Sequence, residues 1–180
     1  MPTSSKNKIL VVDDDPAMTD YLSLRLAAGF TVVATNDPLK TLDLAHKERP
    51  DLILCDITMP GMDGYELCRR IKDDPNMADT PVIFLTAART EMEDERRGLK
   101  AGAVDYLNKT LDSSVLEARL RLHLALRDAQ LELKNQNALL EAKVARRTAE
   151  LEASREALRE AMHNLRTTQV SAGVYWVQVP

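Results

Sequence analysis

Short apolar runs alternate with segments of helical periodicity in the amino-terminal part of the chain. The runs predict five strands, near residues 8–12, 31–35, 52–55, 82–85 and 104–107. The segments between them predict helices near residues 16–28, 38–47, 64–73 and 92–101. Strands that alternate with helices pair in parallel through right-handed crossovers. The pattern therefore predicts an α/β fold, a five-stranded doubly wound parallel sheet with helices on both faces.

Capping and turn residues support these boundaries. Two Asp-Pro pairs, at residues 15–16 and 37–38, place a capping carboxylate before a proline that suits the first turn of a helix. Gly29 and Gly102 stand where the first and the last of these helices should end. These capping and turn residues agree with the predicted helix boundaries of one compact domain.

A single long helix is expected from Asp112 to about Thr168, because this stretch contains neither Pro nor Gly. Its seam residues follow one another in steps of three and four, with one stutter near Val144. They are Leu133, Asn137, Leu140, Val144, Thr148, Leu151, Arg155, Leu158, Met162 and Leu165. The helix could pack on its own domain, but at about 1.5 Å per residue it would extend far past a small sheet. We therefore expect a coiled coil and a parallel homodimer through residues 112–168, since the polar residues at Gln130, Asn137 and Arg155 disfavour higher oligomers.

Composition narrows the class of protein. The chain has 180 residues, of which 44% are hydrophobic and 29% charged, so it is globular and carries no expected membrane insertion. Residues 1–8 lack the features of a secretory signal, which predicts a cytoplasmic protein. A net charge of -4 without a basic stripe argues against direct nucleic-acid binding. Cys55 and Cys68 are expected to be reduced core residues.

Acidic residues follow two of the expected strands. Residues 13–15 are three consecutive aspartates after the first strand, and Asp56 ends the third. The carboxyl ends of parallel strands line one crevice, so carboxylates distant in sequence can meet at a single metal ion. This arrangement predicts a site for Mg²⁺ and a phosphoryl group.

The chain resembles the receiver domain of two-component response regulators over residues 8–125. Four motifs, in this order at strand ends, carry the resemblance. They are Val11–Pro16, Asp56 with Met59–Gly64, Leu85–Ala87 and Gly102–Lys109. The resemblance implies a flavodoxin-like fold. It divides the chain into a flexible N-terminus (1–7), the receiver domain (8–125), a coiled-coil signalling helix (126–168) and a short tail (169–180), which could be the result of truncation or a docking peptide.

The resemblance also implies how the acidic residues act. Asp56 would be the phospho-accepting nucleophile, forming an acyl phosphate, and it would also face the metal. Asp14 would bind Mg²⁺ directly and Asp13 mainly through water, while Thr58 would contribute its backbone carbonyl.

Three further residues match the family pattern. Lys109 would contact a phosphoryl oxygen and the hydroxyl of Thr86 another. Movement of Thr86 would leave space that Tyr106 fills by rotating inward. Taken singly, Lys109 is better interpreted as an exposed loop residue and Thr86 as a strand-end cap. Both fall at the carboxyl ends of expected strands beside the same crevice, however, which favours the functional interpretation. The catalytic chemistry expected is self-phosphorylation and dephosphorylation, with no separate enzymatic domain.

Two features depart from the family pattern. Thr110 follows Lys109 where the family has a proline after a cis peptide bond, and a cis bond before another residue costs about 2.5–4 kcal/mol. The sequence leaves this bond as cis or trans. Thr58 and Ala88 are expected at the mouth of the pocket, where they would influence attack by water on the acyl phosphate.

The histidines are not expected to bind metal, because none has a second ligand at metal spacing. His46 and His123 are interpreted as solvent-facing or seam residues. Residues 163–168 faintly resemble the phospho-accepting box of histidine kinases, which would make the chain part of a hybrid sensor. Because Asn164 and Thr168 stand where that box has an acidic residue and a proline, His163 is interpreted instead as an exposed histidine of the coiled coil.

The functional prediction is a response regulator that takes phosphate from a sensor histidine kinase or phosphotransfer protein and changes the packing of a dimer. Two alternatives stay open. One is a phosphorylation-independent coiled-coil adaptor, and the other is a fragment of a larger hybrid kinase or effector protein.

Overall fold

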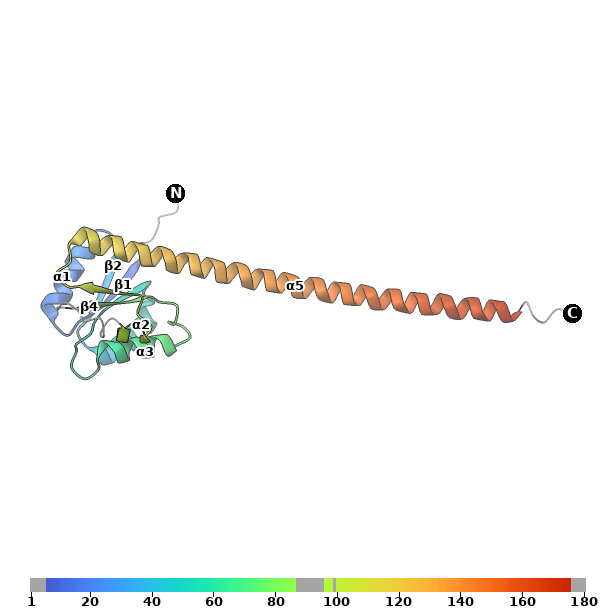
Figure 1. The fold of residues 1–180 in the computed structure, drawn as a ribbon, viewed down its shortest axis with the longest axis horizontal. Coiled ribbons are helices and arrows are strands. Elements are labelled where there is room, and N and C mark those ends of the chain that lie inside the picture. The colour runs from blue at the N-terminus through green and yellow to red at the C-terminus, as the bar shows by residue number, and fades with distance from the viewer. Residues whose placement is uncertain (1–5, 87–95, 99, 176–180) are drawn as a thin grey trace. The chain divides into compact units, whose positions relative to one another are not determined.

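A five-stranded parallel sheet forms the centre of the amino-terminal unit (Figure 1). The computed structural model describes residues 6–86, 96–98 and 100–175, with side chains as far as residue 165. The strands are β1 (Lys8–Val12), β2 (Thr31–Thr35), β3 (Leu52–Asp56), β4 (Val82–Thr86) and β5 (Asp105–Asn108). Their order in the sheet is β2-β1-β3-β4-β5, and every neighbouring pair is parallel. The predicted flavodoxin-like α/β fold is confirmed.

The helices are α1 (Pro16–Leu26), α2 (Thr41–Glu48), α3 (Gly64–Asp73) and α5 (Ser113–Tyr175), and a short 3-10 helix, η1 (Pro38–Lys40), precedes α2. The two expected capping aspartates begin α1 and the short helix η1, while α2 begins after η1 without a side-chain cap. The side chain of Asp15 accepts a hydrogen bond from the backbone N–H of Ala17, and that of Asp37 accepts one from Leu39. Each carboxylate therefore satisfies an N–H that the first turn leaves without a partner.

Several predicted boundaries were inexact, among them the end of the first helix, which lies at Leu26 and not at residue 28. The fifth strand begins at Asp105, one residue later than predicted, because its pairing with β4 starts with Asp105 opposite Ile83. Val104, just before it, is 40% exposed. The expected helix 38–47 is divided into η1 and α2. The long helix continues to Tyr175, past the predicted end near Thr168, because a single glycine such as Gly173 weakens a helix without having to end it. Of the expected helix 92–101, residues 96–98 and 100 are helical and the rest lies outside the described residues.

Two hydrophobic clusters cover the two faces of the sheet. Because side chains alternate along a strand, Ile9 and Val11 face one cluster while Leu10 and Val12 face the other. The first cluster includes side chains from α1 and from the start of α5, and the second includes side chains from α2 and α3. All the aliphatic residues of β1 after Lys8 are fully buried, which explains why the strand reads as a continuous apolar run.

Polar contacts fix the first turns of α5 to the sheet. Arg127 donates hydrogen bonds to the backbone carbonyl of Asp51 at 2.8 Å and to its carboxylate at 2.6 Å. The other carboxylate oxygen of Asp51 accepts a 2.7 Å bond from the backbone N–H of Lys8. Nearer the start of α5, Arg119 and His123 both contact the Asp105 carboxylate, at 3.2 and 2.9 Å.

The remainder of α5 forms a second unit, which begins at Leu131. The seam residues from Leu133 to Leu165 are exposed, with Leu140 at 57% and Leu151 at 70%. None of the helices in the described part of the chain is long and apolar enough to cross a membrane.

Candidate functional site

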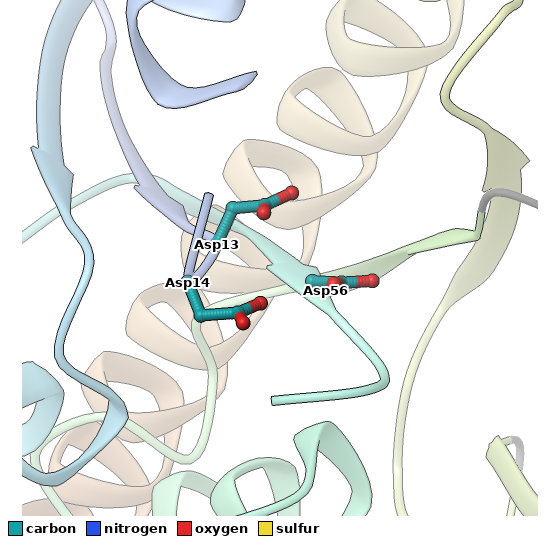
Figure 2. A group of neighbouring side chains, drawn as sticks. All are labelled: Asp13, Asp14 and Asp56. Atoms are coloured by element: carbon teal, nitrogen blue, oxygen red, sulfur yellow. The ribbon is translucent and has the colours of Figure 1, made fainter. Parts of the chain in front are cut away.

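Three carboxylates come together at the carboxyl edge of the sheet (Figure 2). Asp13 and Asp14 directly follow β1, and Asp56 is the last residue of β3. These two strands are hydrogen-bonded neighbours, with Val12 opposite Cys55. One oxygen from each carboxylate lies within 4.8 Å of the others. The strand-end arrangement predicted from the sequence is therefore present.

The three carboxylates differ in burial and in partners. Asp13 is fully buried, Asp56 is 8% exposed and Asp14 is exposed. Asp13 Oδ1 accepts a 3.0 Å hydrogen bond from the backbone N–H of Asp15, and Asp56 Oδ1 accepts one of 2.8 Å from Ile57. In both side chains one oxygen is thus held by the loop that follows, and the Oδ2 atom faces the shared site.

Lys109 joins the two buried carboxylates. Its Nζ atom lies 2.6 Å from Asp13 Oδ2 and 3.0 Å from Asp56 Oδ2, and its side chain is 11% exposed. The backbone N–H of Lys109 donates to the carbonyl of Thr86 at 2.9 Å, which brings the end of β4 next to the lysine. The described residues contain no cis peptide bond, so Lys109–Thr110 is trans. The lysine reaches the predicted site without the cis bond of the family.

Burial and ion pairing shift the pKa values of Asp56 and Lys109 in opposite directions. Burial raises the pKa of Asp56 above its ordinary value, although the Lys109 ammonium opposes this effect. Burial alone would lower the pKa of Lys109, but its bonds to Asp13 and Asp56 outweigh burial and raise it. Lys109 therefore stays positively charged while the Asp56 carboxylate is held close to it.

The donor set fits a hard divalent cation. Mg²⁺ prefers carboxylate, carbonyl and water oxygens, and three carboxylates of suitable spacing are present. Asp13 Oδ2 is buried and contacts Lys109 Nζ at 2.6 Å. A water molecule bound to the cation would be a second donor to this oxygen, which fits the expected indirect role of Asp13.

Gly64 contributes to the site in a way that the sequence motif did not reveal. A Cβ atom at this position would lie 2.3 Å from the backbone oxygen of Asp56, so no larger residue fits. The N–H of Gly64 also donates a 2.8 Å bond to the carbonyl of Ile57. The glycine thus lets α3 begin directly against the backbone of Asp56. Its signal in the sequence was a glycine at the first position of a helix, where the residue has no propensity advantage.

Thr86, Tyr106 and Thr58 are the remaining predicted site residues that the structure describes. Thr86 ends β4 and Tyr106 lies in β5, where the half-buried Tyr106 packs against the core. The side chain of Thr58 is exposed, and the role of its carbonyl stays a prediction. Ala88 lies outside the described residues.

The histidine interpretation needs a correction for His123. Its side chain is 12% exposed and pairs with Asp105, because α5 packs its early turns on β5. It is neither solvent-facing nor a seam residue. His46 is about half exposed and lies 2.7 Å from Asp74. Cys55 and Cys68 are free and buried as predicted, and burial raises the pKa of the Cys68 thiol to about 11.

Comparison with known proteins defines the class. The family model described as response regulator receiver domain matches residues 9–121. The chain belongs to this family, whose members take part in two-component phosphorelay signalling and interact with sensor histidine kinases or phosphotransfer proteins.

Particular relatives and structures agree with this assignment. The chain is 37% identical to a probable cyclic di-GMP phosphodiesterase of Vibrio cholerae over 94% of its own length and 38% of the relative's. It is 43% identical to the response regulator PleD of Caulobacter vibrioides over 63% of its length and 25% of PleD. The chain therefore spans less than half the length of these relatives.

Solved structures include single receiver domains of the same fold. A putative response regulator from Chloroflexus aurantiacus aligns with a TM-score of 0.63 at 34% identity, covering 67% of this chain and 99% of that one. The chemotaxis protein CheY4 of Vibrio cholerae aligns with a TM-score of 0.62 at 30% identity, covering 65% and 98%.

Proposed function

We propose that this chain is a phosphorylation-dependent switch whose phosphoacceptor is Asp56. The observation that carries the proposal is the contact of Lys109 Nζ with both Asp13 and Asp56, within a cluster of three carboxylates. A carboxylate that needs only structural pairing would be satisfied by the lysine alone. The additional acids at the same point supply oxygen ligands for a metal ion, which phosphoryl transfer requires.

In the proposed reaction, an Asp56 carboxylate oxygen attacks the phosphorus of a phosphorylated kinase, phosphotransfer protein or small phosphodonor. A bond forms between that oxygen and phosphorus while the bond from phosphorus to the donor breaks, and its electron pair leaves with the donor. The product is an acyl phosphate on Asp56. Lys109 would pair with an oxygen of the transferred group, replacing part of its contact with the carboxylates.

The residues proposed to hold Mg²⁺ are Asp14 and Asp56 directly, the backbone carbonyl of Thr58, and Asp13 through water. When bound, the ion neutralises charge on the transferring oxygens. Asp13 and Lys109 orient the buried Asp56 side chain, and the Gly64 contact fixes the backbone from which that side chain extends.

Switching is proposed to involve Thr86 and Tyr106. The Thr86 hydroxyl would bond to the phosphoryl group, and Tyr106 would be favoured in its inward position, where it packs against the core. Tyr106 precedes Leu107 and Asn108 on the strand that leads to Lys109, so the phosphoryl site and the tyrosine share one short segment.

The output is proposed to pass through α5. The similarity to the Vibrio cholerae relative covers 94% of this chain, which takes in much of α5 as well as the receiver domain. We propose that residues 112–168 pair with a second copy as a parallel coiled coil and that phosphorylation alters this packing. By analogy with that relative, a helix of this kind would link the receiver to an output such as cyclic di-GMP turnover.

The test uses the full chain with acetyl phosphate and Mg²⁺, read by intact mass and by acid- and base-labile phosphate. We expect one phosphoryl group on the wild-type protein and none on Asp56→Asn. Adding a chelator should also prevent the modification. Phosphate on Asp56→Asn at the wild-type level would refute the assignment.

The second candidate is a constitutive dimeric adaptor, which the exposed apolar seam favours independently of any phosphate. Light scattering with and without beryllofluoride separates the two functions. A dimer of identical affinity and identical helix packing in both conditions supports the adaptor, while a change in either supports the switch.

A further inference from the structure

Tyr106 occupies a closely fitted seat formed by two other elements. A Cβ atom placed on Gly98 would lie 2.1 Å from Cε2 of Tyr106 and 2.9 Å from its hydroxyl oxygen. No residue larger than glycine can therefore stand at position 98 while the tyrosine ring keeps this orientation. On the other side, the Tyr106 hydroxyl donates a 2.7 Å hydrogen bond to the hydroxyl of Tyr65. We call the pair Gly98 and Tyr65 the Tyr106 seat.

Aromatic packing gives the seat a fixed shape. The ring of Phe84 makes edge-to-face contacts with Tyr65 and with Tyr106, each with ring centroids 5.2 Å apart. The guanidinium of Arg97, the neighbour of Gly98, lies 4.8 Å from the centre of the Tyr65 ring. Tyr65 is 5% exposed and therefore has little freedom to follow Tyr106 if that ring leaves. These contacts favour one orientation of the Tyr106 ring over others.

Tyr65 is also connected to the phosphoacceptor. It directly follows Gly64, where an added Cβ atom would lie 2.3 Å from the backbone oxygen of Asp56. Gly64 and Tyr65, at the start of α3, therefore connect Asp56 with Tyr106 through a series of contacts. Thr86, which lies at the end of β4, is not part of this series.

We propose that the Tyr65 hydroxyl is a positioning group that holds Tyr106 in its inward orientation, with Gly98 providing the space for the ring. This rests on the proposed function, because the consequence of the seat is a bias in the response to a phosphoryl group on Asp56. The half-buried Tyr106 that packs against the core is the inward form. Phosphorylation and the Tyr65 bond then favour the same orientation, and each strengthens the other.

A purely structural role for Tyr65 would depend on its ring, whereas the proposed role depends on its hydroxyl. Tyr65→Phe separates the two, since it keeps the contacts with Phe84 and Arg97 and removes only the oxygen. Tyr21→Phe is the matched control, because the Tyr21 hydroxyl bonds to Arg25 on the exposed surface of α1. Both variants delete one atom from a hydrogen-bonded tyrosine.

The first measurement follows the ring signals of isotope-labelled tyrosine by NMR in the full chain, with Tyr106→Phe used to assign the Tyr106 signal. Loss of one hydrogen bond should lower the ratio of inward to outward Tyr106 by roughly three- to tenfold in Tyr65→Phe. Tyr21→Phe should leave the ratio unchanged. An unchanged ratio in Tyr65→Phe overturns the proposal.

The second measurement titrates beryllofluoride in the presence of Mg²⁺. Because the coupling is reciprocal, Tyr65→Phe should weaken beryllofluoride binding measurably, by a factor that is at most the one found for the Tyr106 ratio. Binding that is unchanged or tighter, together with a shifted Tyr106 ratio, overturns the link to phosphorylation. Failure of the wild-type chain to bind beryllofluoride counts against the proposed function, and the NMR result in its absence still decides whether the seat exists.

Gly98→Ala provides an independent variant. Alanine favours a helix more than glycine does, so the local helix should be retained. The methyl group should displace the Tyr106 ring even though Tyr65 is intact, and the Tyr106 signal should move in both the free and the beryllofluoride-bound chain. A wild-type Tyr106 signal in a folded Gly98→Ala protein contradicts the seat.

Discussion

The two units of this chain differ in how their side chains are covered. In residues 6–130, the sheet is buried on both faces and even charged groups such as Asp13 have partners within the unit. In residues 132–165, every side chain is exposed, including those of the apolar seam. The first unit specifies its fold through its own contacts, whereas the second is a helix whose apolar side chains stay exposed.

Local ion pairs do not remove this difference. Arg146 and Arg147 both lie 3.3 Å from Glu150, but these side chains are more than half exposed. Such pairs contribute only about 0.3–0.5 kcal/mol each on a helix surface. If the second unit is stabilised by pairing with another chain, its stability should depend on protein concentration, whereas the stability of the first unit should not.

The largest expected effect distinguishes the two units directly. Phe84→Ala removes a fully buried ring and should lower the free energy of unfolding by about 3–5 kcal/mol at any concentration. Leu151→Ala removes a side chain that is 70% exposed, and it should cost less than about 0.5 kcal/mol in dilute, monomeric protein. Urea denaturation at low and high protein concentration measures both. A large loss for Leu151→Ala in dilute protein would show that the seam is covered within one chain.

Charged residues on the seam should break the proposed dimer. Leu151→Glu combined with Leu158→Glu should weaken dimerisation at least about a hundredfold, or about 2.7 kcal/mol. Leu139→Glu is the control, because Leu139 is 72% exposed but lies off the seam. Sedimentation equilibrium on the three proteins gives the dissociation constants. Equal weakening by the control would mean that general surface hydrophobicity, and not a seam, drives association.

The anchor at the start of α5 should have an intermediate effect. Arg127→Met keeps much of the aliphatic side chain but leaves the Asp51 carboxylate without its guanidinium partner. We expect a loss of about 1–3 kcal/mol, as for a partly buried group that loses a charged hydrogen bond. Hydrogen exchange should become faster around residues 124–130 and stay unchanged around 150–160. Arg146→Met, which alters an exposed arginine of the second unit, serves as the matched control.

The smallest expected effect concerns pH. Because the pKa of Asp56 is raised in the folded protein, its charged form is disfavoured there, and Asp56→Asn should be modestly more stable than the wild type at neutral pH without Mg²⁺. As the pH falls through the raised pKa toward the ordinary value of 3.8, the wild-type carboxyl gains a proton and the difference should disappear. Thermal unfolding of both proteins from pH 7 to about pH 4 tests this. A stability difference between the two proteins that grows as the pH falls would contradict this prediction.

Much of the first unit could be predicted from local patterns. Buried parallel strands read as uninterrupted apolar runs, and Asp37 identifies a helix start through a bond only two residues away. The acid cluster followed from Asp13 and Asp56 standing at the ends of neighbouring strands. Each of these inferences needs only the sequence near the residue and the rule that parallel strands end at one edge.

The missed features depend on residues that are distant in sequence. Arg127 and Asp51 are 76 positions apart, and His123 and Asp105 are 18 apart, so neither charge indicates its partner. The contact of Gly98 with Tyr106 depends on a helix and a strand approaching more closely than their separate patterns reveal. The coiled coil remains a prediction, since its test requires a second chain.

Lys109 determines the net charge of the carboxylate site. Three aspartates set against a single ammonium leave two negative charges in the pocket, which is the charge that one divalent ion cancels. A monovalent ion would leave a net negative charge at the site, and this charge would repel an arriving phosphate. Without the lysine, the three carboxylates would carry one negative charge more than a divalent ion cancels. By leaving two negative charges, the lysine favours a divalent over a monovalent ion at the metal site proposed above.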